Sequence, residues 1–88
     1  MTHRATGLEH VVNVKVIAPY SIEVEFDDGM IRRLHLEPEL RGPVFEPLRD
    51  PEYFALVKVD PEAGTIVWPN GADLAPEFLY VNGEQIAP

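Results

Sequence analysis

The chain lacks cysteine, and it has neither a long apolar run nor many basic residues. Without cysteine it can form no disulfide, supply no thiolate to a metal and use no thiol as a nucleophile. Packing must therefore stabilise the fold, and a reducing compartment suits such a chain. No segment approaches the run of about eighteen apolar residues that a membrane span needs, and the start, MTHRATGLEHVV, has no apolar stretch of signal-peptide length. We expect a cytoplasmic protein that does not contact the membrane.

Basic residues are outnumbered by acidic ones. Seven Lys and Arg against fifteen Asp and Glu give a net charge of −8. Each contact with a nucleic-acid phosphate needs a Lys or Arg, so direct binding to DNA or RNA is disfavoured. A basic protein would be attracted by the same charge, although an acidic composition by itself most often serves solubility.

The length limits the chain to one domain. A domain of 88 residues buries about 60–65% of the surface that its unfolded chain exposes, so its core must be compact. The 45% hydrophobic and 25% charged residues are ordinary for a globular protein, and disorder is not expected despite nine prolines. We expect a single domain over residues 1–88, with a disordered N-terminus over residues 1–9.

The first third of the chain alternates apolar and polar residues, which predicts half-buried strands. Apolar residues occupy every second position over residues 12–16 and 22–26, and a third strand is expected over residues 30–36. Bends at residues 18–20 and 27–29 join them, the second as a three-residue loop with its glycine in the left-handed conformation. The register that groups apolar side chains and pairs opposite charges sets these residues opposite one another: Val12 and Phe26, Val14 and Val24, Lys15 and Glu23, Val16 and Ile22, Phe26 and Met30, Ile22 and Leu34, and Glu23 and Arg33.

The middle of the chain changes character. Residues 37–49 contain prolines and glycines and show no period, so we expect a connection with one helical turn near residues 45–48. The sequence Asp50-Pro51-Glu52 then gives an N-cap acid, a proline at the first helical position and an acid in the first turn. It predicts a short helix over residues 51–56, anchored by Tyr53 and Phe54.

A second hairpin is expected over residues 57–68, with residues 60–64 as its turn. Four apolar side chains of this hairpin would lie on one face, and that face should meet the first sheet. The expected pairs are Val57 with Trp68 and Val59 with Ile66.

The C-terminal part begins with Asn70-Gly71, a turn sequence. Asp73 or Ala75 would cap a closing helix that contains residues 76–80, and residues 81–88 would add a weak strand or fray. The expected fold is a small α+β domain with an antiparallel β-meander of three strands, a second β-hairpin and two short helices.

Segment 65–80, reading TIVWPNGADLAPEFLY, places a strand, a turn, a helix start and the only tryptophan in sixteen residues. With the DDG hairpin and the middle stretch F..LRDPEYFALVKVD, it resembles the bacterial family catalogued as domain of unknown function 2442. The resemblance covers nearly the whole chain. It implies a small α+β domain without an assigned activity, and it supplies no catalytic residues.

The same resemblance bears on partners. Some longer members of that family continue into a helix-turn-helix, for which this sequence leaves no room, so we expect no direct binding to DNA. Members are often encoded beside another short protein, in an arrangement similar to that of toxin–antitoxin pairs. The resemblance therefore implies a protein partner encoded nearby.

Little in the chain points to catalysis. The single serine, Ser21, is expected to face His35 across two strands, a contact that suggests a nucleophile and its base. Polar pairs of this kind on a solvent face are about ten times commoner than catalytic ones. No motif surrounds Ser21, so we assign it no catalytic role and expect no enzyme.

Metal and cofactor sites are not expected either. The three histidines lack metal-site spacing, and the six glycines are scattered singly instead of forming a phosphate-binding loop. Glu23, Glu25 and Asp27 do line one strand face, with Cβ atoms about 7 Å apart along it. Because Lys15 and Arg33 would flank them, a solvated, ion-paired face is the better interpretation.

The turn after the second hairpin is the remaining candidate site. An indole beside a glycine turn could form a small pocket or an interaction surface from Trp68, Asn70, Gly71, Asp73 and Tyr80. A structural explanation, which we favour, puts the indole in the core, gives the glycine a positive φ and makes the aspartate a helix cap.

Two functions follow from these observations. The favoured one is a non-enzymatic protein-interaction module whose acidic surface or strand edge binds a basic protein encoded nearby, in an antitoxin-like role. The same edges would also allow a homo-oligomer. The alternative is a small-ligand-binding or weakly catalytic domain that uses residues 68–80, and it requires an accessible indole.

Overall fold

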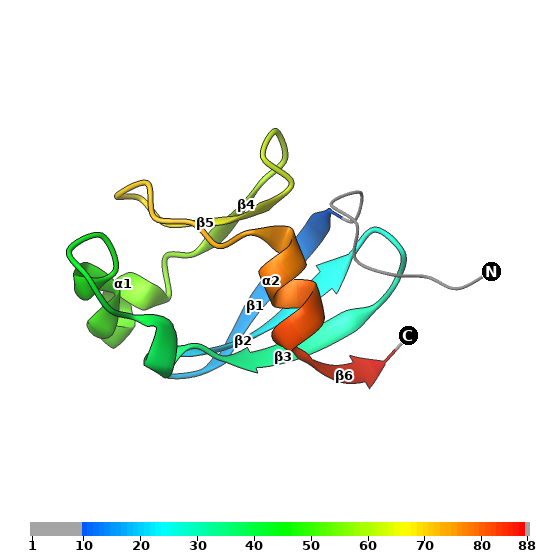
Figure 1. Ribbon diagram of the computed structural model, residues 1–88, viewed down its shortest axis with the longest axis horizontal. Helices are drawn as coiled ribbons and strands as arrows, with labels where there is room; N and C mark the ends of the chain where they lie inside the picture. The colour runs from blue at the N-terminus through cyan, green and yellow to red at the C-terminus, as the bar shows by residue number, and fades with distance from the viewer. Residues whose placement is uncertain (1–9, 88) are drawn as a thin grey trace.

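The computed structural model describes residues 10–87, which form an antiparallel sheet with shorter elements packed on one of its faces (Figure 1). In chain order the elements are β1 (Val11–Ala18), β2 (Ser21–Phe26), β3 (Ile31–His35), the 3₁₀ helices η1 (Glu37–Glu39) and η2 (Glu46–Arg49), α1 (Pro51–Phe54), β4 (Lys58–Asp60), β5 (Thr65–Val67), α2 (Pro76–Asn82) and β6 (Glu84–Ala87). The main sheet has the order β1-β2-β3-β6, and β4 and β5 form a separate two-stranded sheet. This architecture confirms the expected α+β class. The expectation for residues 1–9 lies outside the described residues.

The core lies between the main sheet and the elements above it. Helix α2 crosses in front of the sheet, and the β4-β5 hairpin lies over the β1 end of it (Figure 1). One cluster of buried side chains joins all these parts, so the two sheets share a core. Its buried members are Val11, Ile22, Val24, Phe26, Leu34, Leu36, Leu40, Leu48, Phe54, Ile66, Trp68, Ala72, Leu79 and Tyr80.

The register of the first three strands is largely as the sequence predicts. Gly29 has a φ of 87° and ends a three-residue loop in which its N–H donates to the Phe26 carbonyl. Placing apolar residues opposite one another therefore predicted the strand register correctly, because one face of the sheet is buried. The confirmed pairs are Val14 with Val24, Lys15 with Glu23, Val16 with Ile22, Ile22 with Leu34, and Glu23 with Arg33.

The start of β1 differs from the prediction. Val11, not Val12, lies opposite Phe26, because the register shifts between Val11 and Asn13. Val11 is 2% exposed and Val12 is 53% exposed. A β-bulge inserts one extra residue, which reverses the alternation of side chains beyond it. The Val11 N–H donates to the Gly64 carbonyl, so the bulge also ties β1 to the second hairpin.

The first bend is tighter than expected. Ala18 pairs with Ser21, which leaves Pro19 and Tyr20 as a two-residue turn, and a second register shift precedes Ala18. Tyr20 has a φ of 65°, a left-handed conformation that costs a non-glycine residue roughly 1–2 kcal/mol. Its ring packs edge-on against Phe54 at 5.7 Å, which offsets that strain.

The connection after β3 contains two 3₁₀ helices. The helical turn expected near residues 45–48 is η2, whereas η1 was not predicted. Asp50 caps α1 as expected, since its Oδ1 accepts the Glu52 N–H at 3.0 Å. Helix α1 ends at Phe54, two residues before the predicted end, and Phe54 is fully buried.

The second hairpin pairs Val59 with Ile66 as predicted, but its ladder is shorter than expected. It ends at Lys58 and Val67, so the predicted pairing of Val57 with Trp68 is not formed. The reason is the following turn, because the Trp68 N–H donates to the Ala72 carbonyl instead.

The C-terminal segment completes the main sheet. Ala75 is the N-cap of α2, one of the two predicted alternatives, while Asp73 forms a β-bridge with Val67 and does not cap the helix. Gly83 ends the helix, and β6 then pairs with β3. The tail therefore forms a strand, which makes the expected three-stranded meander a four-stranded sheet.

The bulge in β1 predicts opposite outcomes for two neighbouring valines. Val11→Ala should lower the free energy of unfolding by about 1–3 kcal/mol, because it removes buried methyl groups. Val12→Ala should change it by less than about 0.5 kcal/mol. Urea denaturation of the two variants measures both values, and a larger loss at Val12 would contradict the bulge.

Candidate functional site

The interaction surface predicted from the sequence divides into buried and exposed residues. Trp68 is 2% exposed and Tyr80 is 6% exposed, so both side chains belong to the core. Asn70, Gly71 and Asp73 are exposed. Only these three can contact another molecule without a change in the fold.

The Trp68 indole is fully engaged inside the protein. Its Nε1–H donates to the Phe54 carbonyl at 2.9 Å, and its ring lies 5.6 Å from the Phe54 ring. Both the apolar and the polar part of the side chain are therefore satisfied. This arrangement matches the structural explanation of Trp68 and deprives the ligand-binding alternative of the accessible indole it requires.

Tyr80 joins the closing helix to the main sheet. Its ring packs edge-on against Phe26 at 4.9 Å, the Arg32 guanidinium lies 4.7 Å from its centroid, and its hydroxyl donates to Asp28 Oδ2 at 2.8 Å. Burial, together with the hydrogen bond to the Asp28 carboxylate, raises the pKa of the Tyr80 phenol above its ordinary value of 10.0.

Asn70 has a positioning role that the sequence did not reveal. Its Oδ1 accepts the Ala72 N–H at 3.1 Å, which shapes the turn that Gly71 closes with a φ of 89°. Its Nδ2 donates to the Val44 carbonyl at 2.8 Å. The turn therefore holds the connection between η1 and η2, which is distant in sequence.

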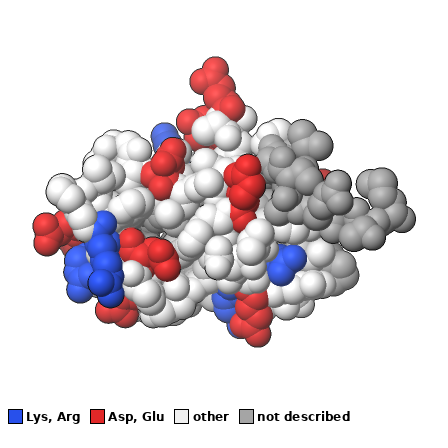
Figure 2. All heavy atoms as spheres, in the orientation of Figure 1, with Lys and Arg blue, Asp and Glu red and all other residues white. Residues whose placement is uncertain are grey.

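That connection lies at one end of the molecule, where charged side chains gather. In Figure 2 the largest group of basic side chains on the visible face covers the end that carries α1 and η2, with acidic side chains beside it. From the sequence this segment was expected only to connect two elements, with one helical turn near residues 45–48. In the sequence, the charged residues that lie among the prolines and glycines of residues 37–49 could have indicated a site here.

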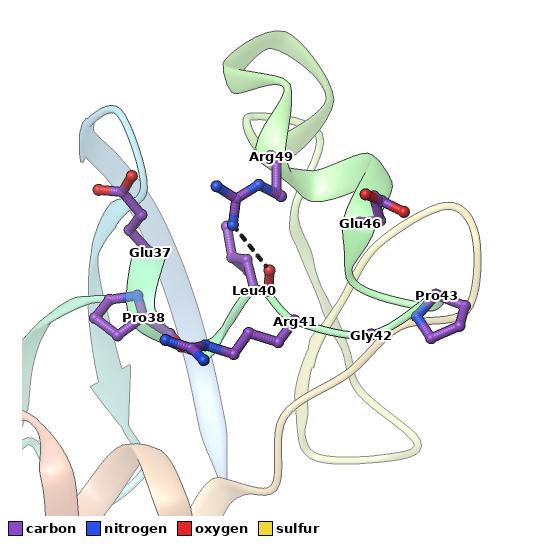
Figure 3. A pocket seen from close by; sticks show the side chains of 8 residues that line it. All are labelled: Glu37, Pro38, Leu40, Arg41, Gly42, Pro43, Glu46 and Arg49. Carbon is purple, nitrogen blue, oxygen red and sulfur yellow. Dashed lines mark hydrogen bonds between the residues drawn. The ribbon is translucent and has the colours of Figure 1, made fainter.

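A hollow of about 740 Å³ opens between η1 and η2 (Figure 3). Its lining includes Leu40, which is 1% exposed and anchors the segment in the core, together with Pro38 and Pro43. Gly42 has a φ of 87° and turns the chain between the two 3₁₀ helices. Charged side chains and prolines therefore line the hollow together, on a segment that Leu40 anchors in the core.

Two arginines and two glutamates line the same hollow. The Arg49 Nη1 donates to the Leu40 carbonyl at 3.2 Å, the contact drawn in Figure 3, and the Arg41 Nε donates to the Pro38 carbonyl at 3.2 Å. Glu37 and Glu46 lie on opposite sides of the hollow in the same view. This arrangement presents positive charge in the centre and negative charge on both flanks.

Ser21 and His35 meet as the register predicted. The Ser21 Oγ lies 2.8 Å from the His35 Nδ1, and the Nε2 of the same ring lies 3.5 Å from the Glu37 Oε1. The His35 and Glu37 side chains are 56% and 52% exposed. Water therefore screens the contact, which fits a polar pair on a solvent face better than an activated nucleophile.

The acidic strand face also follows the prediction. Glu23 accepts from the Arg33 Nη2 at 2.8 Å, so this carboxylate is ion-paired as expected. Within residues 10–87, no group of three metal-ligating side chains converges. Over the same residues, no helix has both the length and the apolar character to span a bilayer.

The two contacts of Asn70 can be separated by substitution. Asn70→Asp keeps the acceptor for the Ala72 N–H but removes the donor to Val44, whereas Asn70→Ala removes both. Asn70→Asp should therefore speed amide hydrogen exchange at Phe45, Glu46 and Leu48 by several-fold, since losing one hydrogen bond is worth about 1 kcal/mol.

Hydrogen exchange at the Trp68 and Gly71 amides should become faster only in Asn70→Ala, because that variant alone disrupts the turn in which both amides are hydrogen-bonded. Exchange followed by NMR gives both readouts in one experiment. Unchanged exchange at residues 45–48 in both variants would show that the Val44 contact does not hold the connection.

The raised pKa of Tyr80 predicts a loss of stability at alkaline pH. Its protonated form is favoured in the folded state, so the stabilisation is complete below the unfolded pKa of about 10 and falls as the pH rises through the folded pKa. Urea midpoints between pH 8 and 11 should therefore fall more steeply for the unmodified protein than for Tyr80→Phe. The control, Tyr53→Phe at a half-buried position, should keep the steeper slope.

Comparison with known proteins places the chain in a family. No curated protein and no solved structure matches it. A family model described as "Protein of unknown function (DUF2442)" matches residues 11–85, from the start of β1 into β6. The match includes the turn at Asn70, the hollow between η1 and η2 and the whole core. The chain is therefore a member of the DUF2442 family.

Proposed function

We propose that this protein is a cytoplasmic, non-enzymatic interaction module that binds a basic protein partner, in an antitoxin-like role. The observation that carries the proposal is the hollow between η1 and η2, a depression lined by two arginines, two glutamates and prolines on a segment that Leu40 anchors in the core. Protein interfaces commonly combine apolar contacts with charged and hydrogen-bonding side chains.

The charge of the chain supports a basic partner. The net charge is −8, and Glu37, Glu39 and Glu46 are all exposed in or beside the hollow. Such a surface accelerates the approach of a positively charged protein and disfavours a polyanion. Val44, 55% exposed on the loop that Asn70 holds, adds apolar surface next to the hollow.

The strand edges are less suitable than the hollow as a binding surface for a protein partner. The middle of β1 is an edge whose Val14 N–H is already taken by the Asn13 Oδ1 at 3.0 Å, and β1 also carries two register shifts. Such features discourage the addition of another strand. The opposite edge, β6, remains the place where a homo-oligomer would form.

The proposal is tested by co-expression with the protein encoded beside this one. The two should co-purify at moderate salt, and the yield of complex should fall as the ionic strength rises. Glu37→Lys combined with Glu46→Lys should reduce the bound partner at least about fivefold, because like charges would then face the basic surface.

The control for this test is Glu62→Lys, an exposed acid in the turn between β4 and β5. It shifts the net charge in the same direction at a site away from the hollow, and it should retain most of the binding. A neutral or acidic neighbour that does not bind, or equal losses in the reversal and its control, would count against the proposal.

A further inference from the structure

We infer that Arg41 and Arg49 form a carboxylate-binding site, which accepts an Asp or Glu side chain flanked by Lys or Arg in a peptide segment. The inference rests on the proposed function, because it assigns the partner chemistry that the hollow would recognise. It adds that the hollow recognises an acidic residue of the partner in addition to the partner's positive charge.

The two guanidinium groups are held in place without being neutralised. Each donates one N–H to a backbone carbonyl, Arg49 to Leu40 and Arg41 to Pro38, both at 3.2 Å. Within the described part of the chain, neither forms an ion pair with a carboxylate. Arg33 behaves differently, since it pairs with Glu23 at 2.8 Å. The hollow therefore contains two arginines whose charge no carboxylate of the described residues offsets.

The nearby glutamates do not serve as their partners. Glu37 lies 3.5 Å from the His35 Nε2, and Glu46 lies across the hollow from Glu37 (Figure 3). Both occupy the first turns of 3₁₀ helices, where the exposed N–H groups favour an acid. The remaining N–H groups of Arg41 and Arg49 are therefore available to a ligand.

The backbone beneath these arginines is fixed from two sides. The Tyr20 hydroxyl donates to the Arg49 carbonyl, and Asn70 donates to the Val44 carbonyl at 2.8 Å. The side-chain and backbone contacts together reduce the motion that binding would have to arrest, which favours affinity.

The pattern of charge selects the ligand. A guanidinium matches a planar carboxylate through two parallel N–H donors, and two such groups line this hollow. Glu37 and Glu46 on the flanks repel a polyanion such as nucleic acid but attract Lys or Arg. In a peptide with a single acid between basic residues, the acid can bind the two arginines while the basic residues pair with the two glutamates.

The test uses two synthetic peptides and needs no identified partner. The first is Lys-Lys-Glu-Lys-Lys with blocked ends, and the second replaces its Glu with Gln. Long-range attraction to an acidic protein predicts that the Gln peptide, which has one more positive charge, binds more tightly. Carboxylate recognition predicts the opposite order, with the Glu peptide tighter by about threefold to fivefold, the effect of one exposed ion pair.

Titrations followed by NMR measure both affinities and locate the site. The Nε–Hε signals of Arg41 and Arg49 should shift with the Glu peptide and much less with the Gln peptide. Arg41→Gln and Arg49→Gln should each weaken the Glu peptide about threefold to fivefold. Simple attraction predicts stronger binding in both variants, since each makes the protein more acidic.

Lys58→Gln is the matched control, because it removes one positive charge at an exposed position on β4. It should leave the preference for the Glu peptide intact. Tighter binding of the Gln peptide, or arginine variants that bind the Glu peptide at least as well as the unmodified protein, would overturn the inference. Co-purification with the neighbouring protein is a separate measurement, so the proposed function could survive that result.

Discussion

Phe54 is the side chain on which the arrangement of the molecule depends. Its ring contacts Tyr20 at 5.7 Å and Trp68 at 5.6 Å, and its carbonyl accepts the Trp68 indole N–H. These contacts join the first β-bend, helix α1 and the end of β5, which are far apart in sequence. Because the chain contains no disulfide, packing contacts of this kind hold its separate elements together.

The same centre positions the proposed binding surface. Tyr20 reaches from its packing on Phe54 to the Arg49 carbonyl, and the turn after Trp68 lets Asn70 reach the Val44 carbonyl. Residues 65–80 therefore act on the surface indirectly, by fixing a loop that they do not form. The proposed binding surface therefore depends on the folding of these residues, because the hollow keeps its shape only if the core beneath it is intact.

Much of the fold could be predicted because local rules and burial agreed. The register of β2 and β3 followed from Glu23 opposite Arg33, and the cap at Asp50 followed from its position before a proline. The bulge that exposes Val12 could not be predicted, because it depends on the hydrogen bond from Val11 to Gly64 in a distant hairpin. Strand β6 was ambiguous for the same reason, since its pairing with β3 is not encoded locally.

The sequence by itself determined the α+β class, the main registers and the identity of TIVWPNGADLAPEFLY as a folding element, because periodicity, turn residues and caps act over short distances. Only the tertiary structure decided what lies at the surface. It buried Trp68 and Tyr80, and it set Arg41 and Arg49 beside one hollow with no carboxylate partner among residues 10–87. Exposure and the convergence of charges depend on contacts between segments far apart in the chain, and no local pattern specifies those contacts.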